Sequence, residues 1–179
     1  MNYSVTKVKT LNGREGYGFS CVLLKNGKKV ASCYDYGDGA DIHIEWDNRT
    51  PAVVKNRNFE DIIIERPGYI EEAQFNDFVN SLPIIKGEVP EYNMFPSPHL
   101  VIEDLVNHSI GLKKISSMLK KSVIFKTPDN KILSSKPSND KSLDDLLNAI
   151  QSKHNDYQIL NKLGLEEVYN IFKTHNLIG

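Results

Sequence analysis

The segment from Gly16 to Trp46 constrains the fold most strongly, because it holds two strand-like runs on either side of Asn26-Gly27. Asn-Gly accepts the two positive φ angles of a type I′ turn, so we expect a hairpin that has this dipeptide as its loop. After it, Ile42, Ile44 and Trp46 alternate with polar residues and predict a third strand. The chain is therefore expected to begin with an antiparallel sheet.

The simplest register of this hairpin pairs Leu23 with Val30 and Cys21 with Ser32. Side chains alternate along each strand, so one face of the hairpin is expected to be core. That face carries Phe19, Cys21, Leu23, Val30 and Tyr34, and the other carries Ser20, Val22, Leu24, Lys29, Ala31 and Cys33. In this register the two cysteines point apart, so we expect two free thiols, as is usual in a reducing cytosol.

The remaining elements predict an α+β fold in four consecutive parts. A weak edge strand over 3–9 and one or two short strands within 53–65 are expected as well, and amphipathic spacing predicts a helix over 69–82. Four prolines interrupt the next segment, and a Pro-Asp-Asn turn predicts a later hairpin, 123–127 with 131–135. The expected parts are an N-terminal sheet plus helix (1–82), a Pro-rich linker (83–98), a helical connector (99–121) and a C-terminal ββαβα unit (122–179).

The sequence contains none of the residue arrangements on which common catalytic sites depend. It has no G-x-S-x-G elbow and no C-x-x-C pair, and no two of its five histidines are spaced for a shared metal on a helix. We therefore expect no catalytic residue, no metal, no cofactor and no enzyme activity. With no signal-peptide run and no span of about 18 apolar residues, we expect a cytoplasmic protein that does not enter a membrane.

The acidic run DYGDGAD, from Asp35 to Asp41, is the best cluster of oxygen ligands. Its acids fall at every third residue, whereas an EF-hand needs ligands at alternate positions, so we interpret Asp35, Asp38 and Asp41 as turn acids. A small enzyme or nucleotide-binding site that uses these three acids with His43 is an alternative, and it requires that the four groups converge in a pocket.

Charge is distributed unevenly along the chain. Up to Leu112 there are 11 Lys and Arg against 16 Asp and Glu, and from Lys113 onward 11 against 7. The acidic part predicts a surface for a basic partner through Asp35, Asp38, Asp41 and Glu45, and the apolar linker adds Tyr92, Met94 and Phe95. An alternative is nucleic-acid binding by a basic patch of Lys113, Lys114, Lys120, Lys121, Lys126 and Lys131.

Several short motifs resemble small accessory proteins carried by phages and other mobile elements. They are Gly16-Tyr17-Gly18-Phe19, Asn26-Gly27-Lys28-Lys29-Val30, Asp35-Tyr36-Gly37-Asp38-Gly39, Val123-Ile124-Phe125-Lys126 and Ile159-Leu160-Asn161. The resemblance implies a protein of the bacterial host cytoplasm that inhibits a host defence system, as anti-CRISPR proteins do by binding a Cas-type nuclease. It implies no role for any single residue.

Overall fold

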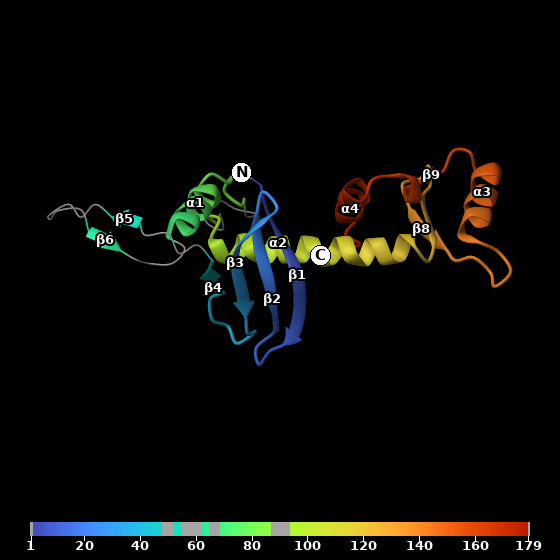
Figure 1. Ribbon diagram of the computed structural model, residues 1–179. Coiled ribbons are helices and arrows are strands. Elements are labelled where there is room, and N and C mark those ends of the chain that lie inside the picture. The colour runs from blue at the N-terminus through green and yellow to red at the C-terminus, as the bar shows by residue number, and fades with distance from the viewer. Residues whose placement is uncertain (1, 48–51, 55–61, 65–68, 87–93, 179) are drawn as a thin grey trace. The chain divides into compact units, whose positions relative to one another are not determined.

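The computed structural model describes residues 2–47, 52–54, 62–64, 69–86 and 94–178. The fold is α+β, as the sequence predicts (Figure 1). The chain divides into two compact units, residues 1–109 (unit 1) and 110–179 (unit 2). Helix α2 (Pro98–Leu119) is continuous through Gly111 and contributes residues to both units.

Unit 1 is built on a four-stranded antiparallel sheet with strand order β1-β2-β3-β4. Its strands are β1 (Tyr3–Asn12), β2 (Tyr17–Lys25), β3 (Lys28–Asp35) and β4 (His43–Trp46). Asn26 and Gly27 connect β2 to β3 with φ angles of 50° and 78°, which confirms the expected turn. A separate antiparallel pair joins β5 (Ala52–Val54) to β6 (Ile62–Ile64).

The register of the β2–β3 hairpin differs from the expected one, because Val30 is an extra residue in β3. Leu24 still pairs with Lys29, but Leu23 pairs with Ala31. Such a bulge shifts every later pair by one residue and so exchanges the two faces of β3. The expected faces are therefore wrong for part of β3: Ala31 and Cys33 are buried in the core, and Tyr34 pairs with Ser20 on the other face. The prediction that the cysteines point apart is wrong for the same reason, since Cys21 pairs directly with Cys33.

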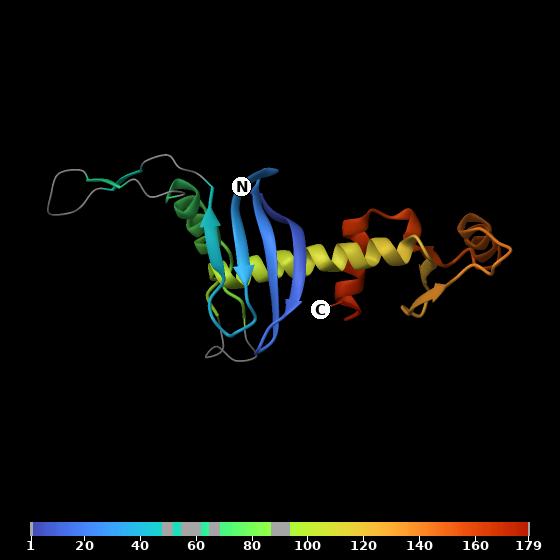
Figure 2. The ribbon, with the colours of Figure 1, turned by 60° about the horizontal axis from the view of Figure 1, so that its bottom comes forward.

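Helix α1 (Tyr69–Asn80) and the beginning of α2 cover one face of this sheet (Figure 2). Phe75 and Val79 of α1 and Ile102 and Val106 of α2 are almost completely buried against it. Trp46 packs on Phe75 with ring centroids 5.8 Å apart. The core of unit 1 is thus one apolar layer between sheet and helices, and its buried strand residues are Tyr3, Phe19, Cys21, Leu23, Val30, Ala31 and Cys33.

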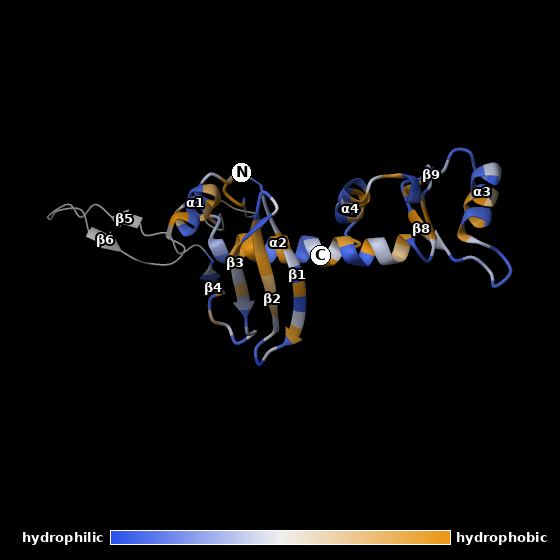
Figure 3. Ribbon diagram, in the orientation of Figure 1, coloured by the Kyte–Doolittle hydropathy of each residue, from blue (hydrophilic) through white to orange (hydrophobic). Residues whose placement is uncertain are grey.

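Unit 2 contains a three-stranded antiparallel sheet in the order β8-β7-β9, with two helices. The strands are β7 (Val123–Lys126), β8 (Ile132–Ser135) and β9 (Gln158–Ile159), and the helices are α3 (Leu143–Lys153) and α4 (Leu165–Thr174). Ser142 caps α3, because its hydroxyl accepts a hydrogen bond from the Asp145 amide at 3.1 Å. Along α3, hydrophobic residues alternate with hydrophilic ones (Figure 3), and the apolar face packs on Val123, Phe125 and Ile159.

A short 3₁₀ turn, η2 (Leu160–Lys162), follows β9, and α4 buries Val168, Tyr169 and Phe172 beside Ile115 of α2. Within the described ranges, no helix is both long enough and apolar enough to cross a lipid bilayer.

Candidate functional site

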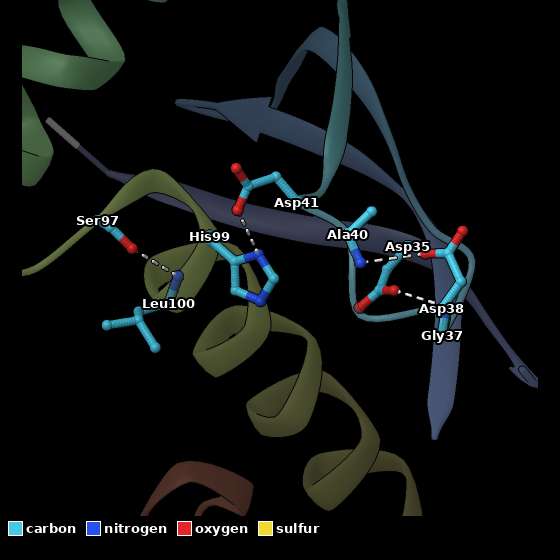
Figure 4. Close-up of polar contacts among 8 residues, drawn as sticks. All are labelled: Asp35, Gly37, Asp38, Ala40, Asp41, Ser97, His99 and Leu100. Atoms are coloured by element: carbon cyan, nitrogen blue, oxygen red, sulfur yellow. Dashed lines mark hydrogen bonds and ion pairs between the residues drawn. The ribbon is translucent and has the colours of Figure 1, made fainter. Parts of the chain in front are cut away.

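The acidic loop between β3 and β4 is held by its own aspartates. The Asp35 carboxylate accepts a hydrogen bond from the Gly37 amide at 2.8 Å, and the Asp38 carboxylate accepts one from the Ala40 amide at 3.2 Å (Figure 4). Gly37 and Gly39 have φ angles of 63° and 78°, a region in which side chains are strained. These carboxylates therefore act first on the local backbone, which is the role of acids in Asx turns.

Asp41, at the end of this loop, faces the first turn of α2. Its carboxylate is fully exposed, and its Oδ1 lies 3.8 Å from Nδ1 of His99 (Figure 4). Ser97 precedes the helix, and its hydroxyl accepts a hydrogen bond from the Leu100 amide at 3.3 Å. The acidic loop and the start of α2 thus lie next to each other in unit 1.

The four groups of the alternative enzyme site do not come together. Asp35 lines a shallow pocket of about 250 Å³ with Glu15 and His99, but Asp38 and Asp41 do not line this pocket. His43 instead lies 3.7 Å from the carboxylate of Glu45, on the exposed surface of β4. Across the part of the chain that is described, no three His, Cys, Asp or Glu side chains are grouped so that they could hold a metal ion.

An apolar groove lies between α1, the segment that follows it and the start of α2. It has a volume of about 450 Å³ and is lined by Phe78, Leu82, Pro83, Ile85, Pro96, Leu100, Val101, Asp104 and Leu105. The Ile85 and Met94 backbones hold its rim together through two hydrogen bonds of 3.0 and 2.9 Å. Asp104 is its only charged lining residue among those described.

Met94 and Phe95, two of the three partner-binding residues predicted in the linker, lie at this rim. Met94 is 51% exposed and Phe95 is 76% exposed, next to the lining residue Pro96. Tyr92, the third predicted residue, lies outside the described residues. Sequence reasoning missed the groove itself, because the spacing of Phe78, Leu100 and Leu105 is the same as that of ordinary core positions on amphipathic helices.

The predicted basic patch lies within unit 2 and is only partly available. Lys113, Lys114, Lys120 and Lys121 are exposed. The Lys131 ammonium lies 2.6 Å from the Asp129 carboxylate, and this pairing raises the pKa of Lys131 and lowers that of Asp129. Lys126 is half-buried and lines a polar pocket of about 430 Å³ with Gln158, Glu167, Asn170, Ile171, Thr174 and His175.

No protein-family model matches this sequence, and no match was found among curated proteins or solved structures.

Proposed function

We propose that this chain is a non-enzymatic binding protein that inhibits a host defence nuclease by occupying a basic surface on it. The observation that carries the proposal is the apolar groove of unit 1, with exposed Met94 and Phe95 at its rim. We name this groove together with Met94 and Phe95 the docking surface. Apolar pockets with a charged surround are typical of protein interfaces, in which a few central apolar residues supply most of the binding energy.

The charge around the docking surface favours a basic partner. Asp104 lines the groove, and the same helix contacts Asp41 through His99 in its first turn. Up to residue 112 the chain carries 11 Lys and Arg against 16 Asp and Glu, a formal charge of 11 − 16 = −5. Complementary charge of this kind speeds association and excludes acidic partners.

A nuclease guided by RNA offers such a partner surface, because it holds its nucleic acid in a positively charged channel. An acidic protein with an apolar anchor would compete with nucleic acid for that channel. The defence setting itself comes from the sequence resemblance, and the structure supports only the acidic and apolar character of the surface. Exposed Asp38, Asp41 and Glu45 belong to the same acidic unit and would add to the attraction.

The test measures DNA cleavage by purified Cas-type nuclease complexes with and without the protein. We expect inhibition, and we expect the double variant M94A/F95A to bind at least about tenfold more weakly, since truncating interface anchors costs more than about 1.4 kcal/mol. Because both side chains are exposed, the substitutions leave the fold intact. L133A, which removes an exposed leucine of unit 2, is the matched control and should inhibit like the original protein.

Two results would count against the proposal: no nuclease in the panel is inhibited, or M94A/F95A inhibits as strongly as the unchanged protein. Binding of DNA or RNA that weakens steeply with salt and is lost in K113Q/K114Q would instead favour the nucleic-acid alternative. That alternative rests on the four exposed lysines near the end of α2 and on the formal charge from residue 113 onward, 11 − 7 = +4.

A further inference from the structure

Cys21 and Cys33 lie directly opposite each other on the two central strands of unit 1. The bulge at Val30 brings them into register, so that Cys21 of β2 pairs with Cys33 of β3. Both side chains are in the buried layer, with 4% and 0% of their surface exposed, and both are free thiols. The docking surface involves neither residue.

The spacing of opposite residues in an antiparallel pair suits a disulfide. Their Cα atoms lie about 4.5 to 5.5 Å apart, depending on the type of pair, and disulfides span Cα separations of about 4.4 to 6.8 Å. Opposite side chains also project to the same face of the sheet. Closing the bond therefore requires side-chain rotation and no change of register.

We propose that Cys21 and Cys33 are a modification site at which peroxide forms a reversible disulfide across the β2–β3 hairpin. The Cys21 thiolate attacks one oxygen of hydrogen peroxide; an S–O bond forms, the O–O bond breaks, and the leaving hydroxide takes up a proton to become water. The Cys33 sulfur then attacks the sulfenic sulfur of Cys21, the S–S bond forms, and the second oxygen leaves as water. Two thiols are oxidised and one peroxide is reduced to two waters.

The order of these steps follows from the surroundings of the two sulfurs. Cys33 hydrogen-bonds to Cys21, which lowers the pKa of the Cys21 thiol, and the same contact together with burial raises the pKa of Cys33. Cys21 is also the less completely buried of the two. Cys21 is thus the sulfur that peroxide oxidises, and Cys33 is the one that resolves the sulfenic acid.

The test treats the full chain with hydrogen peroxide and measures its intact mass. We expect the monomer to lose the mass of two hydrogen atoms, to regain it with dithiothreitol, and to yield a peptide cross-linked through Cys21 and Cys33. The disulfide constrains the unfolded hairpin, so we also expect the thermal midpoint reported by Trp46 fluorescence to rise by at least about 5 °C.

Variants separate the two roles. C33S, whose hydroxyl keeps a hydrogen-bond donor beside Cys21 but cannot form a disulfide, should accumulate a sulfenic acid that dimedone traps at Cys21, whereas C21A should leave Cys33 unmodified over the same time. The double variant C21A/V22C places the thiol on the opposite face and should form no internal disulfide, even though it retains two cysteines. Circular dichroism identifies any variant that does not fold.

The proposal is overturned if folded, peroxide-treated protein retains both thiols for alkylation after unfolding. It is equally overturned if oxidation gives only disulfide-linked dimers, or if C21A/V22C forms the internal bond as fast as the original chain. Each result is independent of nuclease inhibition, so this site and the proposed function can fail separately.

Discussion

The side chain of Asn161 hydrogen-bonds to three backbone groups of unit 2. Its Oδ1 accepts a hydrogen bond from the Ile124 amide at 2.7 Å, and its Nδ2 donates to the carbonyl oxygens of Leu119 and Ser122, each at 2.9 Å. One amide group therefore connects the end of α2, the start of β7 and the 3₁₀ turn. Backbone groups left without partners in a partly buried place are costly, which makes this side chain a point of high sensitivity.

Replacing Asn161 with Ala should lower the stability of unit 2 by about 2 kcal/mol, since three hydrogen bonds are lost from partly buried backbone groups. Hydrogen exchange of the segment 119–126 should then be about thirtyfold faster. N161D tests whether the hydrogen bonds are the cause. It retains the size of the side chain and one acceptor, but it places a carboxylate oxygen beside the carbonyl oxygens of Leu119 and Ser122. It should be at least as destabilising as N161A. N155A, in an exposed loop, should leave the exchange unchanged, and an N161D protein as stable as the original would show that only packing matters.

At the scale of elements, the sequence predicts nearly every helix and strand that the structure describes. The Asn-Gly turn, the third strand and the C-terminal helix are confirmed, because each depends on local chemistry of a few adjacent residues. The bulge at Val30 was not predictable in this way. Nothing in Lys28 to Ala31 distinguishes a bulged from a regular strand, and the choice is made by packing Ala31 and Cys33 against the helices.

At the candidate site too, the sequence predicts local features but not how the helices are placed in space. The apolar, exposed character of Met94 and Phe95 could be read from a Pro-rich segment that cannot form regular structure. The groove beside them needs α1 and α2 to be placed in space, and residue spacing alone does not give that. The acids of the loop could be interpreted as turn residues, because Asp and Gly act on the adjacent backbone.

Helix α2 runs without a break through Gly111, although glycine is a poor helix former. A Cβ atom at this position would lie 2.6 Å from Cε2 of the Tyr169 ring, so the glycine provides the space in which α4 packs on α2 within unit 2. The contact between α2 and α4 therefore explains why a glycine occupies position 111.

The substitution G111A should therefore destabilise unit 2 by up to about 2 kcal/mol, since an overpacking cost of about 1 to 3 kcal/mol is set against a gain of about 1 kcal/mol in helix propensity. Hydrogen exchange of α4 measures the change. In a Y169L background the ring edge is gone, and the same substitution should become neutral or stabilising. A stabilising effect of G111A in the unchanged chain would mean that Tyr169 does not restrict this position.

At the scale of the whole molecule, the two units differ in the ionisable groups that the fold perturbs. In unit 1, burial raises the pKa of Tyr3 above 10.0, and the charges of Glu71 and Asp77 add to the effect. In unit 2, hydrogen bonds from Ser142 lower the pKa of Asp145 below 3.8, and those from Lys131 and Thr127 do the same for Asp129. The two units should therefore lose stability at opposite ends of the pH range.

The direction in which stability changes with pH follows from the difference between each group's pKa in the folded and in the unfolded chain. The folded pKa of Tyr3 is raised, so its contribution is present below the unfolded pKa near 10.0 and is lost as the pH rises through the folded value. The folded pKa of Asp145 is lowered, so its contribution is present above the unfolded value near 3.8 and is lost as the pH falls through the folded one. Ionised Tyr3 would lie between Phe75 and Phe78, whose rings are both 4.9 Å from its own, where no charge is well solvated.

The loss of stability at high pH can be measured for unit 1 alone through the fluorescence of Trp46. This is the single tryptophan of the chain, and it packs in the core of unit 1. Urea titrations followed by its fluorescence should show a midpoint that falls between pH 9 and pH 11, and Y3F should reduce that fall while remaining close to the original protein at pH 7. The comparison of the two proteins removes any part due to the two cysteines, which both proteins share. Identical alkaline losses in both proteins would show that the raised pKa of Tyr3 does not cause the fall, and would contradict the prediction.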